Sequence, residues 1–179
     1  MMRKRRRKNR MRAYAILAVV MMIGVISVLG SFREKEETPI ITESVVSAEE
    51  DYMLDIPLST ELQTQLYEAS KEFGVDYYIM VALIDRETKF DNVIGDNGDS
   101  YGYCQIQPKW WYGLMVEIGA TDLTEARDNF RAGCAIIAQL TEKYQSLEGA
   151  LVAYNQGSYK GSSTAYSREV IENAKRYKA

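Results

Sequence analysis

Residues 76–88 read DYYIMVALIDRET, and the interpretation of the whole chain starts from this stretch. Asp76 is a residue type that commonly caps the N-terminus of a helix. Apolar side chains then recur at helical spacing: Tyr78, Val81, Ala82 and Ile84. The stretch therefore predicts an apolar helix that carries a glutamate, Glu87, near its C-terminal end.

Comparable patterns predict helices before and after this stretch. Ser59 or Thr60 can cap a helix that Gly74 ends, and Pro108 suits the first turn of a helix that reaches Ile118. Three further helices are predicted: one opened by Asp122 or Thr124, one opened by Ser146 and closed near Gly157, and one over residues 162–177.

One segment interrupts the helical pattern. Residues 91–103 contain three glycines together with several Asp and Asn residues, which is typical of a loop or a short hairpin. Residues 58–179 are therefore predicted to form an all-α or α-rich domain with a single short irregular or β-hairpin segment. Because functional residues concentrate on such segments, we expect a site there.

The N-terminal end of the chain has a different character. Residues 1–12 carry eight Arg and Lys residues and no acid, which leaves 14 basic against 25 acidic residues in the rest of the chain. Residues 13–32 contain no charge, and at about 1.5 Å per residue they are long enough to cross a hydrocarbon core of about 30 Å. We expect one transmembrane helix here rather than a buried core helix, because no polar stripe repeats at helical spacing.

The basic cluster predicts the orientation of this helix. Basic residues stay in the cytoplasm, so the cluster predicts a single-pass protein of the cell membrane with an extracytoplasmic domain. Beside a membrane span, the cluster is better interpreted as a topology determinant that meets lipid head groups than as a nucleic-acid site. We expect an uncleaved anchor, although residues 28–30 loosely resemble a signal cleavage site. Residues 33–57 are rich in Glu, Ser and Thr and indicate an acidic flexible linker.

The chain contains no histidine. This excludes the Ser-His-Asp and Cys-His hydrolases and zinc sites that depend on histidine ligands. Acid and base chemistry must then come from carboxylate, tyrosine or lysine side chains. A glutamate that ends an apolar helix suits this role, because partial removal from water raises the pKa of a carboxyl group.

Three short motifs stand in order along the predicted domain. They are ALIDRET at residues 82–88, GYCQIQP at residues 102–108 and AYNQG at residues 153–157. Together, over roughly residues 60–160, they resemble the soluble lytic transglycosylase domain of the lysozyme-like superfamily, which is related to goose-type lysozyme. Thr88 stands where that family usually has serine, Tyr103 and Cys104 replace its usual leucine and methionine, and Asp96 falls at a family serine position.

The resemblance implies a peptidoglycan lytic transglycosylase with Glu87 as the catalytic residue. In that family the glutamate first protonates the oxygen between N-acetylmuramic acid and N-acetylglucosamine. It then takes the proton of the muramic 6-hydroxyl, and a 1,6-anhydro ring closes. No water is consumed, so the resemblance implies neither a metal nor another cofactor.

The resemblance also implies sugar contacts from residues of the same motifs. Gln105 and Tyr154 are expected to bind sugar, and Asn155 either binds sugar or caps its own helix. Thr88 and Tyr103 complete the expected substrate-binding set. The surrounding sequence is rich in aromatic residues that fit stacking against pyranose rings: Tyr101, Tyr103, Trp110, Trp111 and Tyr112.

The two cysteines leave two alternatives open. Under the expected topology Cys104 and Cys134 are both outside the membrane, where a disulfide between them is permitted. Free cysteines are also commonly buried, so the pair can equally be two separate buried thiols.

The function and its setting also leave alternatives. A hydrolytic lysozyme would use water instead of the 6-hydroxyl. Its base could be one of the loop aspartates Asp91, Asp96 and Asp99, although such loops also arise from turn chemistry alone. A non-catalytic wall-binding scaffold is the alternative outside enzymes. The expected partners are peptidoglycan glycan strands, membrane lipid around residues 13–32, and a secretion, conjugation or cell-wall assembly, but no nucleic acid.

Overall fold

Helix α3 (Tyr77–Thr88) lies in the hydrophobic core of the computed structural model, which describes residues 52–179. The Asp76 side chain accepts a hydrogen bond from the backbone N–H of Tyr78 at 2.8 Å, as the predicted N-cap requires. Every residue from Ile79 to Ile84 is buried. The helix ends at Lys89, which adopts a left-handed conformation, so Glu87 lies in its last turn.

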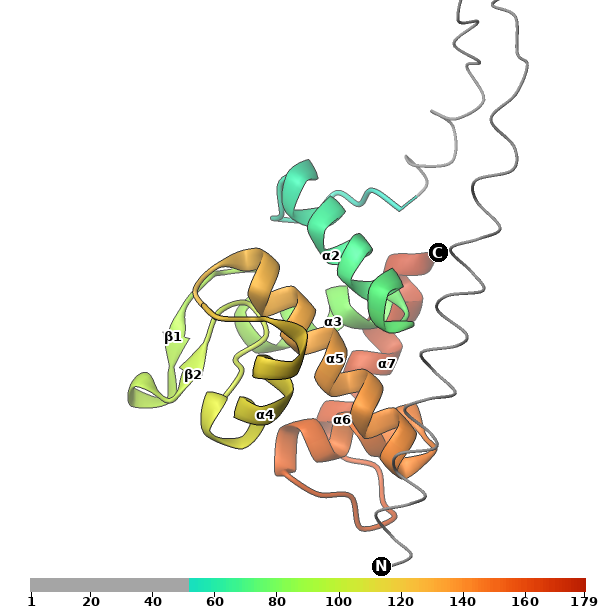
Figure 1. Ribbon diagram of the computed structural model, residues 1–179. Coiled ribbons are helices and arrows are strands. Elements are labelled where there is room, and N and C mark those ends of the chain that lie inside the picture. The colour runs from blue at the N-terminus through green and yellow to red at the C-terminus, as the bar shows by residue number, and fades with distance from the viewer. Residues whose placement is uncertain (1–51) are drawn as a thin grey trace, which may run out of the picture. The chain divides into compact units, whose positions relative to one another are not determined.

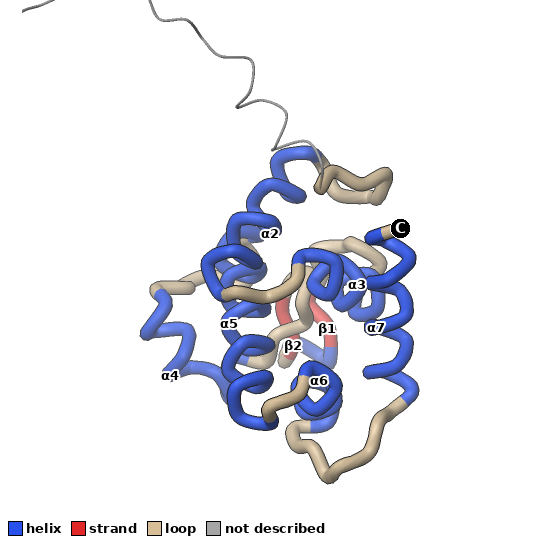
Figure 2. Tube along the Cα trace, turned by 90° about the vertical axis from the view of Figure 1, so that its right-hand side faces the viewer, coloured by secondary structure: helices blue, strands red, loops and turns tan. Residues whose placement is uncertain are grey.

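Five further helices surround α3 (Figure 1). They are α2 (Thr60–Phe73), α4 (Pro108–Ile118), α5 (Ala126–Tyr144), α6 (Leu147–Gln156) and α7 (Ala165–Lys178). The long helix α5 packs against α2, α4 and α6, while α7 runs beside α3 (Figure 2). The result is the α-rich domain that the sequence predicts.

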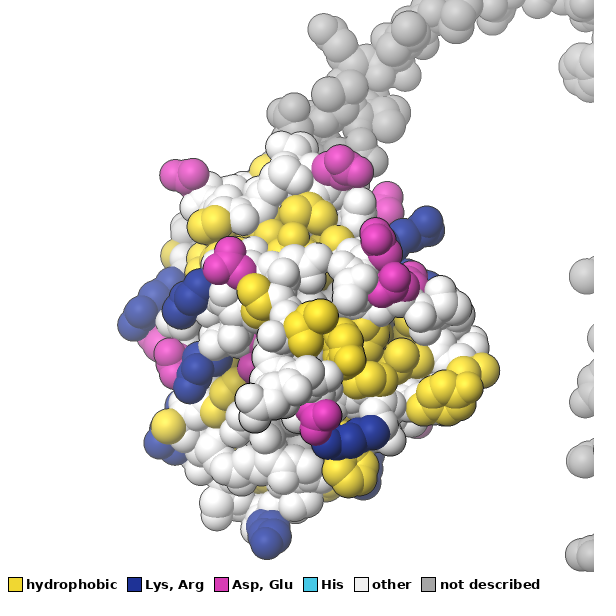
Figure 3. Space-filling model, turned by 90° about the vertical axis from the view of Figure 1, so that its left-hand side faces the viewer, with side chains coloured by type: hydrophobic (Ala, Val, Ile, Leu, Met, Phe, Trp, Pro, Cys, Tyr) yellow, Lys and Arg dark blue, Asp and Glu magenta, His cyan; other side chains and the backbone are white. Residues whose placement is uncertain are grey.

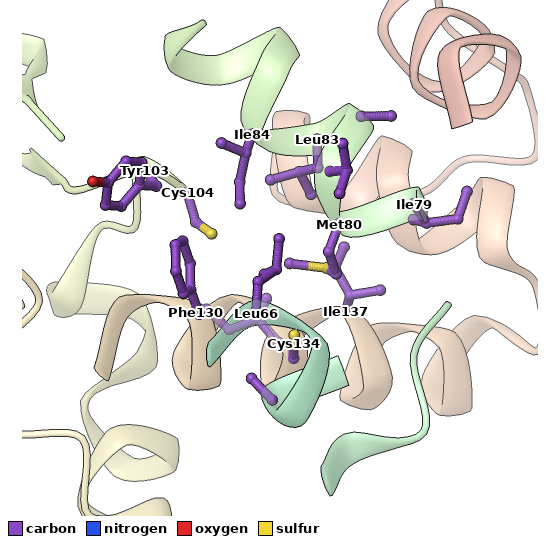
Figure 4. Packing of buried hydrophobic residues seen from close by; sticks show 14 of the residues in the cluster. Leu66, Ile79, Met80, Leu83, Ile84, Tyr103, Cys104, Phe130, Cys134 and Ile137 are labelled. Carbon is purple, nitrogen blue, oxygen red and sulfur yellow. The ribbon is translucent and has the colours of Figure 1, made fainter. Parts of the chain in front are cut away.

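The core is built where α2, α3 and α5 meet. Leu66, Met80 and Phe130 are fully buried there, one from each helix. Figure 4 shows these side chains pointing toward one another, with Cys104 entering from the loop after the hairpin. Gly133 of α5 makes this entry possible, because a Cβ at that position would lie only 2.7 Å from the sulfur of Cys104. The loop is thus seated directly on the core.

The irregular segment forms the predicted hairpin. Strand β1 (Ile94–Gly95) pairs antiparallel with β2 (Ser100–Tyr101), and the short 3-10 turn η3 (Asp96–Gly98) joins them. An isolated bridge between Tyr101 and Ile106 then brings the chain back toward α4. The hairpin therefore presents the second motif at one edge of the helical body.

Most helix boundaries agree with the sequence, and two begin later than predicted. Helix α5 begins at Ala126 after Glu125, because the Asp122 carboxylate instead accepts bonds from the backbone and hydroxyl of Thr124. Helix α7 begins at Ala165, where Thr164 and Ser167 form a reciprocal capping box.

The folded domain starts earlier in the chain than predicted. Residues 52–57 were expected in the linker, but the Tyr52 ring stacks on Tyr67 with centroids 3.8 Å apart. The side-chain amide of Gln63 bonds the N–H and the carbonyl of Leu54 at 2.9 and 3.0 Å, and also the carbonyl of Leu58. These contacts make Tyr52 part of the core, which corrects the predicted boundary at Leu58.

The predicted cytoplasmic segment 1–12, the predicted membrane helix 13–32 and the linker up to residue 51 lie outside the described residues. Within residues 52–179, no helix combines the length and apolar character needed to span a bilayer.

Candidate active site

A cleft of about 790 Å³ is formed by the end of α3, the hairpin, α4, α5 and α6. Glu87, Gln105, Tyr154 and Asn155 all line this cleft, although they come from three separate motifs. Thr88 and Tyr103, which were predicted beside them, are not in its wall. The fold therefore brings together four of the six predicted catalytic and substrate-binding residues.

Glu87 combines access to the cleft with an apolar surrounding. Burial raises the pKa of Glu87 above its ordinary value of 4.5, and the negative charge of Asp96 acts in the same direction. A hydrogen bond from Tyr166 and the positive charge of Arg86 act in the opposite direction, but the net effect is a raised pKa. Glu87 thus stays protonated to a higher pH than an exposed glutamate, as a proton donor requires.

Tyr166 is the contact of Glu87 that the sequence did not reveal. Its hydroxyl donates to Oε1 of Glu87 at 2.6 Å, across 79 positions of sequence. Burial raises the pKa of Tyr166, so the hydroxyl keeps its proton and remains a donor. Helix α7 is fastened to α3 by two further contacts, the Arg86–Glu169 ion pair and a hydrogen bond from Tyr177 to Asp85.

Tyr154 and Asn155 lie next to each other on α6 but differ in their surroundings. The Tyr154 hydroxyl donates to the carbonyl of Cys104 at 2.6 Å, which joins α6 to the loop after the hairpin. Burial raises the pKa of Tyr154 well above its ordinary value, so this donor also stays neutral. Asn155 is exposed, and its side chain makes no hydrogen bond within residues 52–179.

Gln105 lines the cleft, but its amide hydrogens are already used. Nε2 donates to the carbonyls of Val93 and Gly102 at 3.0 and 2.9 Å, which ties both strands of the hairpin together at their base. Gly95 leaves room for this arrangement, since a Cβ there would approach Oε1 of Gln105 to 2.1 Å. The amide hydrogens of Gln105 therefore shape the hairpin, and the predicted contact between Gln105 and sugar stays a prediction.

Thr88 and Tyr103 contact each other away from the cleft. Oγ1 of Thr88 lies 3.1 Å from the carbonyl of Tyr103 and 3.2 Å from that of Ile84. The ring of Tyr103 is only 8% exposed and packs against Phe130. Both residues thus have structural contacts, because the loop that carries Tyr103 turns that ring into the core, and their sugar contacts stay predictions.

Asn129 of α5 fixes the same loop from inside the domain. It is completely buried, accepts from the N–H of Cys104 at 2.9 Å, and donates to the carbonyls of Tyr101 and Leu123. Gly102 has a positive φ of 72°, and a Cβ there would lie 2.1 Å from Nδ2 of Asn129. A polar residue on an otherwise apolar helix face was the available sequence signal for this contact.

A second polar network lies at the rim of the cleft, and we call it the rim network. It consists of Asp96, Ser100, Gln107 and Trp110. The Asp96 carboxylate accepts from the Ser100 hydroxyl and from Nε2 of Gln107, the latter at 3.1 Å. Oε1 of Gln107 in turn accepts from the Trp110 indole at 3.1 Å. The turn of the hairpin is thereby connected to the first turn of α4.

The two cysteines are free and buried in the core, so the structure corresponds to the second alternative and not to a disulfide. Their sulfur atoms lie apart in Figure 4. Burial raises the pKa of Cys104 well above its ordinary value and that of Cys134 to about 12. In the part of the chain that is described, no three His, Cys, Asp or Glu side chains form a group able to hold a metal ion.

The chain has one clear relationship to known families. No curated protein gives a significant match. Residues 65–175, more than half of the chain, match the family described as the transglycosylase SLT domain. This range includes α3 with Glu87, the hairpin, and the α7 residue Tyr166 that contacts Glu87. The chain therefore belongs to the transglycosylase SLT domain family, whose members act on peptidoglycan.

Proposed function

We propose that the protein is a membrane-anchored lytic transglycosylase that cleaves the β-1,4 bond between N-acetylmuramic acid and N-acetylglucosamine, with Glu87 as acid and then base. The family supports glycosidic bond cleavage in general terms. The observation that carries the finer proposal is Glu87 itself. It is a carboxyl group with a raised pKa, at the end of a buried helix and in the wall of the cleft.

In the first step, Glu87 gives its proton to the leaving oxygen O4 of N-acetylglucosamine, and the bond from that oxygen to C1 of the muramic residue breaks. In the second step, the Glu87 carboxylate takes the proton of the muramic 6-hydroxyl while O6 forms a bond to C1. The glutamate ends protonated, as it began, and the product carries a 1,6-anhydro ring.

The surroundings of Glu87 suit both steps. The apolar helix favours the protonated acid that starts the reaction. The Tyr166 hydroxyl donates to Oε1 and so stabilises the carboxylate that exists between the two steps. Of the predicted sugar contacts, Asn155 has an exposed side chain and free polar groups in the cleft wall.

The decisive experiment compares Glu87→Gln with the parent on purified peptidoglycan. Loss of the only proposed acid should lower glycan release by at least about 100-fold. Glu117→Gln is the matched control, because Glu117 is exposed on α4 and is absent from the cleft wall. Undiminished release by the Glu87 variant would remove this residue from the mechanism, and binding without release by the parent would favour a scaffold.

Hydrolysis is the second candidate, and one observation favours it. Asp96 lines the same cleft as Glu87 and offers a second carboxylate that a water-activating base would require. Mass spectrometry of the products separates the two reactions. We expect anhydro-muramic ends, and reducing muramic ends would instead identify a lysozyme.

The proposed place of action is the outer side of the cell membrane, with residues 13–32 as an uncleaved anchor. The support is the distribution of charge, since eight basic residues precede the uncharged stretch and an acidic remainder follows it. There the domain would remodel the wall, or open it locally for a secretion, conjugation or phage-related assembly. In cell fractionation we expect the full-length protein in the membrane fraction and open to external protease. Recovery from the cytosol would contradict the anchor.

A further inference from the structure

Two aromatic residues on α4 are almost equally exposed but face different surroundings. Trp110 is 72% exposed and Tyr112 is 71% exposed. Trp110 belongs to the wall of the cleft, whereas Tyr112 does not. The other large exposed hydrophobic residues of the described chain, Val93, Ile94 and Val116, also lie in the hairpin region and α4. Figure 3 views this side of the domain and shows hydrophobic side chains gathered on it.

Trp110 is held in place although its ring is exposed. Its indole N–H donates to Gln107, and Gln107 is itself bonded to Asp96 and to Ser100 at 3.2 Å. The polar atom of the ring is thus satisfied within the protein. Nζ of Lys109 lies 5.7 Å from the ring centroid, and most of the apolar ring surface is still exposed. An exposed apolar ring whose position is fixed by the surrounding network is typical of a binding surface rather than of a core residue.

The cleft also continues past the tryptophans. A second hollow of about 540 Å³ lies along α5, and it shares three residues with the main cleft: Trp111, Leu140 and Lys143. The two hollows therefore adjoin at the wall that Trp111 contributes. A glycan strand held at Glu87 has a path that extends past the start of α4.

We propose that Trp110 is a stacking platform for a sugar ring beyond the two rings joined by the cleaved bond. The C–H face of an N-acetylated hexopyranose would lie against the indole, whose orientation Gln107 sets. This inference rests on the proposed function. Its consequence is a preference for long glycan strands over short fragments, because a short fragment does not reach the platform.

The test uses the full-length protein in detergent with Trp110→Ala, Trp110→Tyr and Tyr112→Ala. On polymeric glycan strands, Trp110→Ala should lower kcat/KM about tenfold, mainly through KM, and leave cleavage of short fragments unchanged. Trp110→Tyr should keep most of the parent kcat/KM, because tyrosine retains an aromatic face. Tyr112→Ala should match the parent, since it removes a ring of equal exposure outside the cleft.

The proposed stacking role of Trp110 would be wrong if both alanine variants lost kcat/KM on polymeric strands equally, or if Trp110→Ala lost none. Sedimentation with insoluble peptidoglycan, in a Glu87→Gln background, separates this outcome from failure of the proposed function. If the parent releases no product, the catalytic proposal fails. The binding of Trp110→Ala relative to Tyr112→Ala still decides the platform, with weaker binding of Trp110→Ala alone supporting it.

Discussion

Two polar clusters hold the same hairpin and its exit loop, and they do so in opposite ways. Asn129 is fully buried and bonds only to backbone groups, those of Tyr101, Cys104 and Leu123. The rim network joins side chains to side chains, from the exposed Asp96 to the exposed indole of Trp110. One cluster lies inside the domain, and the other lies in the cleft wall.

This difference separates stability from binding. A buried backbone group without a partner is costly, so the Asn129 cluster determines where the loop lies. In the rim network Ser100 is buried, but Asp96 and Trp110 are exposed, and water can replace hydrogen bonds lost at these exposed positions at little cost. Because Asn129 fixes the loop from the inside, the position of the loop does not depend on the rim side chains. These side chains can therefore serve ligand binding. The predictions below test this separation.

The largest effect is expected at the buried cluster. Asn129→Leu leaves the N–H of Cys104 and the carbonyl of Leu123 without partners, while the carbonyl of Tyr101 keeps its bond from the N–H of Ile106. We expect the free energy of unfolding to fall by about 2–5 kcal/mol. Urea denaturation measures this change. Asn173→Leu on α7 is the control and should change stability by less than about 1 kcal/mol. If the free energy of unfolding of Asn129→Leu falls by less than about 1 kcal/mol, the buried cluster does not have the stabilising role inferred here.

An intermediate effect is expected at Tyr166, which is buried and donates a hydrogen bond to Glu87. Tyr166→Phe removes the hydrogen bond that lowers the pKa of Glu87, so that pKa should rise further. The alkaline limb of the pH profile of kcat/KM should therefore move to higher pH.

The same variant has a defined effect on stability. Because the pKa of Glu87 is higher in the folded protein than in the unfolded chain, ionisation of Glu87 destabilises the fold. This loss of stability develops as the pH rises from 4.5 through the folded-state pKa. Tyr166→Phe should add about 1–2 kcal/mol to this cost above that window and almost nothing at acidic pH. Tyr159→Phe is the control, because that hydroxyl makes no side-chain hydrogen bond within residues 52–179. Equal destabilisation by Tyr166→Phe at pH 4 and pH 8 would argue against an ionised partner.

The smallest effect is expected at the rim. Asp96→Asn keeps an oxygen that can accept from Ser100 and Gln107, so stability should change by less than about 0.5 kcal/mol. Loss of the negative charge should lower the pKa of Glu87 and move the alkaline limb to lower pH, opposite to Tyr166→Phe. Asp99→Asn, paired with Lys109 and outside the cleft wall, should leave the limb in place. A loss of turnover near 100-fold in Asp96→Asn would instead indicate a catalytic carboxylate.

Local sequence features predicted the helices and the place of Glu87. Gly74 and Pro108 act through their own backbone conformation, and Asp76 acts on the N–H two residues away, so their effects are visible without the fold. Tyr166 and Asn129 act across many positions of sequence, and a tyrosine or asparagine on an amphipathic helix does not reveal its distant partner. These residues became functional or structural only once the helices were packed.

For the motif residues, the sequence indicated the right positions but did not define their roles. Gln105 and Thr88 were predicted to bind sugar because they belong to motifs that resemble those of the family, but in the structure their hydrogen bonds go to backbone carbonyls, among them those of Gly102 and Tyr103. Position in a motif indicates that a residue matters, and it does not distinguish a residue that contacts the ligand from one that shapes the loop. The left-handed conformation of Gln105, with φ of 49°, is the local detail that decides this case.

The attachment of residues 52–58 to α2 has a mechanical consequence. Tension that travels along the chain to Tyr52 is taken up first by the stacked ring of Tyr67 and by the amide of Gln63. Both belong to α2, which lies at one end of the domain, away from α4 and α6 (Figures 1 and 2). A load on the N-terminal side is therefore spread through α2 into its neighbour α5 before it reaches the hairpin. Such a load would reach the loop of the cleft last, by way of α5 and the hydrogen bonds of Asn129.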